Sequence, residues 1–186
     1  MKARLLLLAS ILSLVPSCAD TGRQQLLETI LGERAGYIDE KTRHAIVEGI
    51  LRGESQHGVD ALLLLAVVEH ESHFRVRAHS RKDALGLMQV RADTARAVAE
   101  RHGIEWKDLE DLHDPVVNIS IGAAYLAELK RTFGSWNLAL AAYLNGPTSV
   151  SKAMASGREV RSRYAKEILG RYRRLEDLYG SGRDAN

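Results

Sequence analysis

The stretch VVEHESHF, residues 67–74, brings two glutamates and two histidines together. Two kinds of chemistry fit this pattern. His70 and His73 would share one face of a helix, as metal ligands do, although the zinc-protease pattern His-Glu-x-x-His has one residue more between its histidines. Alternatively, Glu71 acts without a metal, as a proton donor. No third ligand stands out apart from His79 in the next loop, so we expect no metal site and no cofactor.

Glu71 ends an apolar run, and its neighbours one helical turn back are Val67 and Val68. A carboxyl group in such surroundings is poorly solvated, which disfavours the charged form and raises the pKa. A carboxylic acid that keeps its proton near neutral pH can give it to a leaving group. A glutamate that simply reaches water fits this segment equally well. Glu69 and His73, four residues apart, are expected to pair on the helix surface.

The loop after this segment contains the sequence GLMQ, which could surround a small ligand. Gly86 permits a close backbone approach. Leu87 and Met88 would lay apolar atoms over a site. Gln89 carries both a donor and an acceptor, which suits the recognition of an amide or a sugar.

Helical periodicity recurs along the chain, whereas strand patterns are weak. Residues 61–73 are apolar on nearly every face, so we expect a helix through the core with Asp60 as its N-cap. The other predicted helices are residues 23–33, residues 40–52, a helix capped near Asp93 and ended at Gly103, a helix from Pro115 to Gly134 with Asp114 as its cap, a short buried helix over 137–147, and a short and a longer helix over 148–179. This pattern predicts an all-α fold.

The size and charge of the chain narrow the class of protein. A length of 186 residues suits one compact domain, which is large enough to fold without a metal or a disulfide. Lys and Arg number 26 and Asp and Glu 24, so the net charge of +2 does not indicate a nucleic-acid partner. Basic residues gather near the end of the chain, where they form either a solvated helix face or a surface that attracts anionic glycans or lipids.

The N-terminus reads as an export signal, because a basic start precedes apolar residues 5–15, a run too short to span a bilayer. Two forms of processing stay open. Cleavage before Asp20 would release a soluble protein. Alternatively, VPSC is a lipoprotein signal in which Cys18, the one cysteine, becomes a lipid anchor, and Ala19 after it would direct the protein to the outer membrane. We expect an exported, periplasmic protein, anchored to the outer membrane through a lipidated Cys18.

Four segments in order resemble one family. They are Glu71 with Ser80 and GLMQ, then DPVVNISIGAAYL, then LALAAYLNGP, and last RYAKEILGRYRRL. Together they are similar to the lytic transglycosylases that have a goose-type lysozyme-like fold, and they cover residues 58 to about 176. The resemblance implies a single lysozyme-like helical domain. We divide the chain into a signal peptide (1–18), a lead-in segment (19–36), a catalytic domain (37–180) and a flexible tail (181–186).

The resemblance also implies a reaction on the glycan strands of peptidoglycan. In this family one glutamate protonates the β-1,4 bond between N-acetylmuramic acid and N-acetylglucosamine. The same group then takes the proton from the muramyl C6 hydroxyl, whose oxygen closes on C1 to give a 1,6-anhydro end. Glu71 would carry both roles, which explains why a pair of carboxylates, as in ordinary glycosidases, is not evident.

Further site residues carry over from the resemblance. Ser80 and Gln89 should hold the acetamido group or orient the glutamate. Tyr143 should lie near Glu71 and hydrogen-bond to it or to the sugar. Met88 is expected either to cover a subsite or to fill the core.

The remaining motif residues carry weaker expectations. We interpret the stripe of Asn118, Gly122, Tyr125 and Leu129 as packing, with Gly122 allowing a close helix contact and Tyr125 within reach of the groove. Asn145 stands one place later than the family's asparagine, so its side chain would approach a substrate from a different angle.

Two alternatives remain at this stage. Asp83, three residues before Gly86, could position a water molecule as goose-type lysozymes do, which would make the protein a muramidase that hydrolyses the same bond. The competing interpretation of Asp83 is a solvent-facing loop residue. A non-catalytic murein-binding module is the second alternative. Partners among the cell-wall or secretion machinery are not identified by the sequence.

Overall fold

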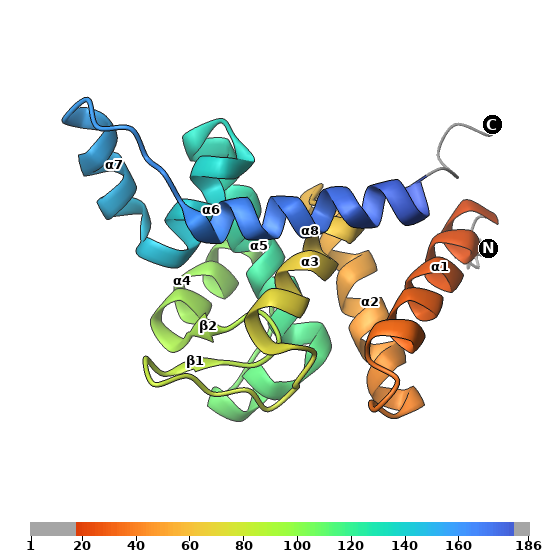
Figure 1. Ribbon diagram of the computed structural model, residues 1–186. Coiled ribbons are helices and arrows are strands. Elements are labelled where there is room, and N and C mark those ends of the chain that lie inside the picture. Colours follow the sequence, from red (N-terminus) through yellow and green to blue (C-terminus); the bar gives the residue numbers. More distant parts are fainter. Residues whose placement is uncertain (1–17, 181–186) are drawn as a thin grey trace, which may run out of the picture.

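The computed structural model describes residues 18–180 of the chain (Figure 1). The predicted signal segment over 1–17, the side chain of Cys18 and the tail over 181–186 lie outside the described residues. The described part contains eight α-helices and one small hairpin, so the prediction of an all-α fold is confirmed. The helices are α1 (Cys18–Arg34), α2 (Glu40–His57), α3 (Ala61–Ser72), α4 (Ala92–His102), α5 (Pro115–Phe133), α6 (Trp136–Asn145), α7 (Pro147–Ala155) and α8 (Arg163–Tyr179), and the hairpin joins β1 (Ala84–Leu85) to β2 (Val90–Arg91).

Helix α3 is the core helix that the sequence predicts. Residues 61–68 are all buried, as expected for a helix that is apolar on nearly every face. Asp60 caps it, because its carboxylate accepts from the backbone N–H of Leu62 at 2.8 Å. The helix ends where His73 takes a left-handed conformation, with φ 50°. Glu71 therefore occupies the last turn, at the edge of the core.

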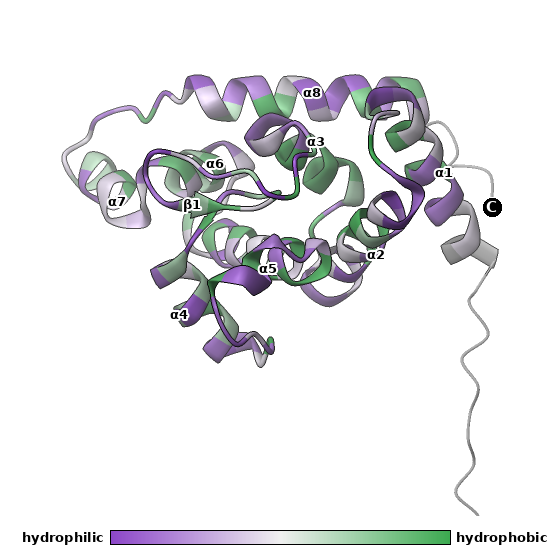
Figure 2. Ribbon diagram, turned by 90° about the horizontal axis from the view of Figure 1, so that it is seen from below, coloured by the Kyte–Doolittle hydropathy of each residue, from purple (hydrophilic) through white to green (hydrophobic). Residues whose placement is uncertain are grey.

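The long helices α2 and α8 hold α3 in place. Helix α5 packs along α2 and α6, and α8 lies across α3 and α6 (Figure 1). In Figure 2 apolar segments of α3 and α5 lie inside the molecule, while α8 alternates between apolar and polar residues. The ends of α5 are as predicted, since Asp114 accepts from the N–H of Val117 at 3.0 Å and Gly134 ends the helix with φ 75°.

Two local expectations change in the structure. The cap of α4 is Arg91 rather than Asp93, because strand β2 runs directly into the helix and leaves Asp93 in its first turn. Residues 19–36, set apart as a lead-in segment, form most of α1, which buries Leu27 and Ile30 completely and packs against α2. No helix between residues 18 and 180 combines the length and apolarity needed to cross a membrane.

Candidate active site

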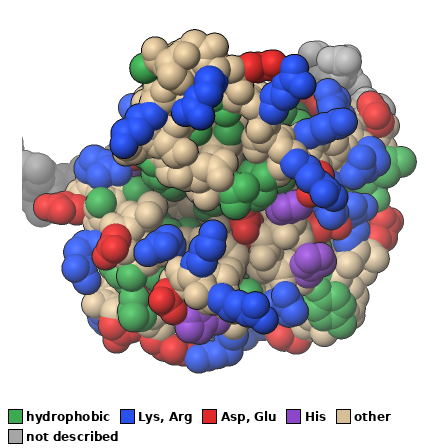
Figure 3. All heavy atoms as spheres, turned by 60° about the vertical axis from the view of Figure 1, so that its left-hand side comes forward, with side chains coloured by type: hydrophobic (Ala, Val, Ile, Leu, Met, Phe, Trp, Pro, Cys, Tyr) green, Lys and Arg blue, Asp and Glu red, His purple; other side chains and the backbone are tan. Residues whose placement is uncertain are grey.

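A cavity of about 500 Å³ lies between the β1–β2 hairpin and the end of α6. Figure 3 brings the side with α4, α7 and the hairpin forward and shows the surface hollowed there, with Lys and Arg side chains around the hollow. Six residues singled out from the sequence line this cavity: Glu71, Ser80, Gln89, Tyr125, Tyr143 and Asn145. Residues from 71 to 145 thus meet at one place, although helices α3, α5 and α6, the loop before β1 and the hairpin turn supply them.

Glu71 is half-buried and is the one carboxylate among the described residues that line the cavity. Its Oε1 accepts a hydrogen bond from the hydroxyl of Tyr164. Burial raises the pKa of Glu71 above its ordinary value, and the bond from Tyr164 offsets part of that rise because it stabilises the charged form. The direction agrees with the expectation from its apolar neighbours, and the side chain is placed to give and to take a proton inside the cavity.

Tyr143 lies beside Glu71 but does not bind it. Its hydroxyl donates to the carbonyl of Met88 at 2.8 Å, and its ring lies 5.4 Å from that of Tyr125. No hydrogen bond therefore joins Tyr143 to Glu71, which Tyr164 binds instead, and a hydrogen bond from Tyr143 to the sugar stays a prediction. Burial, followed by the charge of Glu71, raises the pKa of both Tyr143 and Tyr164 well above the ordinary value, so both phenols keep their protons and act as donors.

Tyr164 is the functional residue that the sequence analysis missed. It stands in RYAKEILGRYRRL, the last of the four segments that resemble the family, to which the resemblance assigns no site residue. Tyr164 lies on the buried face of α8 with Ala165 and Ile168, and its ring meets His70 edge-on at 5.1 Å. A tyrosine on the apolar face of an amphipathic helix needs a partner for its hydroxyl. That position was the available signal for a buried partner such as Glu71.

The side-chain amide group of Gln89 already donates hydrogen bonds to the backbone of its own loop. Its Nε2 donates to the carbonyls of Gly86 at 2.9 Å and Ala78 at 3.2 Å, which uses both amide hydrogens. The side chain can therefore offer a ligand only its oxygen, as an acceptor. Ser80 is complementary, because its Oγ accepts from two backbone N–H groups of its turn and keeps one hydrogen to donate.

The side chains of Leu87 and Met88 do not cover the site, contrary to the prediction. Both are buried, because the GLMQ turn folds inward onto α5. A Cβ on Gly122 would lie 2.4 Å from the sulfur of Met88, so the close contact that Gly122 allows is with this loop and not with another helix. The expected close approach at Gly86 is confirmed, since its φ is 74° and a Cβ there would lie 2.2 Å from the carbonyl oxygen of Leu112.

Asp83 and Asn145 occupy different positions relative to the cavity. The Asp83 side chain is 91% exposed, lies 3.2 Å from His79 and is not part of the cavity lining. This placement gives no support to a water-positioning role. Asn145 lines the cavity from the end of α6, with its Nδ2 bound to the carbonyl of Ala141 at 3.0 Å.

The histidines around Glu71 are not gathered for a metal. No group of three His, Cys, Asp or Glu side chains is suitably arranged within the described part of the chain. Glu69 does not pair with His73 as expected. It lies between Arg34 at 3.2 Å and Arg171 at 3.4 Å, and so ties α1 and α8 to α3.

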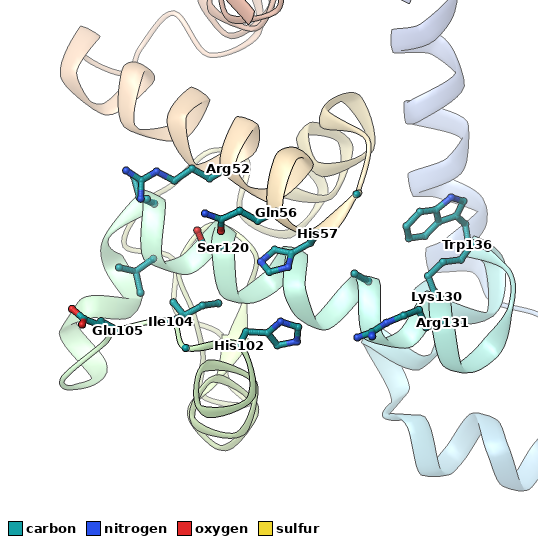
Figure 4. Close-up of a pocket in the computed structure, with 15 residues that line it drawn as sticks. Arg52, Gln56, His57, His102, Ile104, Glu105, Ser120, Lys130, Arg131 and Trp136 are labelled. Atoms are coloured by element: carbon teal, nitrogen blue, oxygen red, sulfur yellow. The ribbon is translucent and has the colours of Figure 1, made fainter. Parts of the chain in front are cut away.

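A larger cavity, of about 900 Å³, lies between α2, α4 and α5. Figure 4 shows Gln56, His57 and His102 gathered in its middle, with Trp136 at its edge. Its one lining carboxylate, Glu105, is exposed, and burial lowers the pKa of His57. It therefore offers no proton donor comparable to Glu71, and the smaller cavity is the candidate active site.

Known proteins that are similar to this chain identify its family and its fold. The family model described as the transglycosylase SLT domain matches residues 49–165. The chain is 40% identical over 96 residues to membrane-bound lytic murein transglycosylase C of Edwardsiella ictaluri, which covers 50% of this chain and 27% of that protein. It is 32% identical to invasion protein IagB of Salmonella typhi, over 69% of this chain and 77% of that protein. The chain thus spans about a quarter of the first relative and most of the second.

Solved structures show the same arrangement of helices. The 70-kDa soluble lytic transglycosylase in complex with bulgecin A has a TM-score of 0.67 at 23% identity, over 87% of this chain and 29% of that one. Lytic transglycosylase Slt from Pseudomonas aeruginosa has a TM-score of 0.65 at 23% identity, over 86% of this chain and 30% of that one. The predicted lysozyme-like helical fold is therefore confirmed.

Proposed function

The chain belongs to the transglycosylase SLT domain family, and we propose that it is a lytic transglycosylase that cleaves the β-1,4 bond between N-acetylmuramic acid and N-acetylglucosamine in peptidoglycan. The observation that carries this proposal is the single half-buried carboxyl group of Glu71 in a cavity of sugar size. Ordinary glycosidases use two carboxylates, one of which activates water or attacks the sugar. A reaction in which the C6 hydroxyl of the muramic acid attacks C1 of the same sugar needs no second carboxylate, so the single carboxyl group of Glu71 is sufficient.

The geometry of Glu71 suits two successive proton transfers. As an acid it gives its proton to the glycosidic oxygen, and the bond from that oxygen to C1 breaks. As a carboxylate, held by the hydroxyl of Tyr164, it takes the proton of the muramyl C6 hydroxyl while O6 bonds to C1. The glutamic acid is restored, no water is consumed, and the product has a 1,6-anhydro end.

Product analysis tests the reaction type. Sacculi digested in water enriched in oxygen-18 should release muropeptides with anhydromuramyl ends, each lighter by one water molecule than a reducing-end product and free of the isotope. Incorporation of the isotope into new reducing ends would instead establish a hydrolase. Binding to sacculi without any release would establish a non-catalytic murein-binding module.

Replacing Tyr164 with phenylalanine should change the pH dependence of this activity. The lost hydrogen bond favours the charged carboxylate, so the pKa of Glu71 should rise further above its ordinary value. Because the first step needs the protonated acid, activity falls as the pH rises through this pKa, and in Tyr164→Phe that fall should move to higher pH. The maximal rate should drop about tenfold to a hundredfold, since a hydrogen bond to a charged group contributes roughly 1.5–3 kcal/mol.

A matched control for this change exists on the same helix. Tyr179 also donates its hydroxyl to a glutamate, Glu33 at 2.5 Å, far along α8 from Tyr164. Tyr179→Phe should leave the pH profile of murein release where it is in the wild type. A profile of Tyr164→Phe that coincides with that of the control would contradict the assigned role of Tyr164.

We also infer that the protein is exported to the periplasm and anchored to the outer membrane by a lipid on Cys18. The apolar segment over residues 5–15 and the VPSC sequence support this inference. Substrate access supports it as well, since peptidoglycan lies in that compartment.

A further inference from the structure

The two walls of the cavity differ in charge. Lys82 and Arg91 line one wall, at the hairpin, whereas the exposed Leu144 and the amide of Asn145 line the other, at the end of α6. The hairpin register pairs Ala84 with Arg91, which places Lys82 two residues before the paired position, at the same end of the hairpin. Both cations therefore stand on one edge of the cavity.

Lys82 and Arg91 lack counter-charges. Both side chains are exposed, and neither forms an ion pair with any residue of the described range 18–180. The one carboxyl group that lines the cavity is Glu71, which accepts a hydrogen bond from Tyr164. Thr94, at the start of α4, adds a hydroxyl beside Arg91. A cavity edge with two unneutralised cations attracts an anionic ligand.

The anionic groups of peptidoglycan are the free carboxylates of the short peptides carried by its muramic acid residues, since the sugar rings themselves are uncharged. We propose that Lys82 and Arg91 bind these peptide carboxylates and make the domain selective for glycan strands with free peptide carboxylates over strands whose carboxylates are blocked as amides. This inference rests on the proposed function and adds a specificity to the same site. It assigns these two residues to the positioning of substrate, with no part in the proton transfers of Glu71.

The test compares two substrates and two double variants. The substrates are peptide-bearing glycan strands with free carboxylates and the same strands whose peptide carboxylates have been converted to methylamides. Lys82→Gln/Arg91→Gln removes both cavity cations. Arg81→Gln/Arg96→Gln removes the same charge from exposed positions on the same loop and on α4, outside the cavity lining. Rates of product release give a preference ratio for each protein.

We expect the wild type to prefer strands with free carboxylates and the cavity variant to lose about tenfold of that preference, because two exposed ion pairs contribute a few-fold each. Added salt should erode the wild-type preference, as it screens exposed charges. The control variant should keep the wild-type ratio. An unchanged ratio in the cavity variant, or an equal loss in both variants, would overturn the inference while leaving the proposed function intact.

Co-sedimentation keeps the two claims separable. The inactive Glu71→Gln protein should bind strands with free carboxylates more tightly than amidated strands, and Lys82→Gln/Arg91→Gln in that background should abolish the difference. Equal binding of Glu71→Gln to both substrates would refute the carboxylate contacts by itself. Failure of the wild type to cleave either substrate would refute the proposed function, whatever the binding results show.

Discussion

Glu71→Gln is expected to lower the rate of murein cleavage about a thousandfold, because general acid–base catalysis by one group supplies roughly that factor. Glutamine has the same shape but can neither give a proton to the glycosidic oxygen nor remove one from the C6 hydroxyl. Release of soluble muropeptides from sacculi measures the effect. Glu69→Gln, two residues earlier on α3, breaks ion pairs with Arg34 and Arg171 and should retain activity. A Glu71→Gln protein as active as Glu69→Gln would exclude Glu71 as the catalytic residue.

Glu71→Gln should also stabilise the fold at neutral pH. Burial raises the pKa of Glu71 in the folded state, so folding favours the protonated carboxyl. Below the pKa of the unfolded chain the group is neutral in both states, and Glu71→Gln should match the wild type. As the pH rises through the folded pKa the wild type loses this advantage, whereas the amide does not. Thermal melts at about pH 3 and about pH 7 should therefore coincide at the first pH and separate at the second, with the variant melting higher.

The sequence predicts the helices well because their signals are local. Asp60 and Asp114 are caps that act on backbone groups two or three residues away, and Gly134 ends a helix through its own φ. The cap of α4 was misplaced because the strand that leads into it is only two residues long and has no pattern of its own. Local signals thus set the elements to within a few residues.

The sequence predicts which residues form the site better than it predicts which of them contact one another. The resemblance identifies Glu71, Ser80, Gln89 and Tyr143, and one cavity brings them together. Which tyrosine binds Glu71 depends on how α8 crosses α3. Tyr164 and Glu71 are separated by 93 residues in the sequence. No periodicity in either helix encodes that crossing. Lys82 and Arg91 escaped notice for a related reason, since nothing in the sequence separates a cation on a cavity wall from an ordinary surface charge.

The inward fold of the GLMQ turn depends on one buried amide that the sequence analysis had interpreted as packing. The Asn118 side chain accepts from the N–H of Met88 at 2.7 Å and donates to the carbonyls of Leu85 at 3.0 Å and Leu112 at 2.8 Å. It is fully buried, so water cannot replace these bonds. Through Met88, whose carbonyl receives the hydroxyl of Tyr143, this amide also fixes the floor of the cavity.

Asn118→Ala should therefore destabilise the fold by about 3–5 kcal/mol, since it leaves three buried backbone groups without partners and each unsatisfied group costs roughly 1–3 kcal/mol, partly relieved by relaxation. Urea unfolding measures the loss, and Ser120→Ala, at a buried serine two residues along α5, should lose less than about 1 kcal/mol. Activity of the folded fraction should fall as well, because a loosened turn no longer holds Gln89 and Tyr143 in place. A folded Asn118→Ala protein with the stability of Ser120→Ala would show that other contacts hold the turn. The position of Gln89 in the cavity would then depend on the hairpin alone, and not on its attachment to α5.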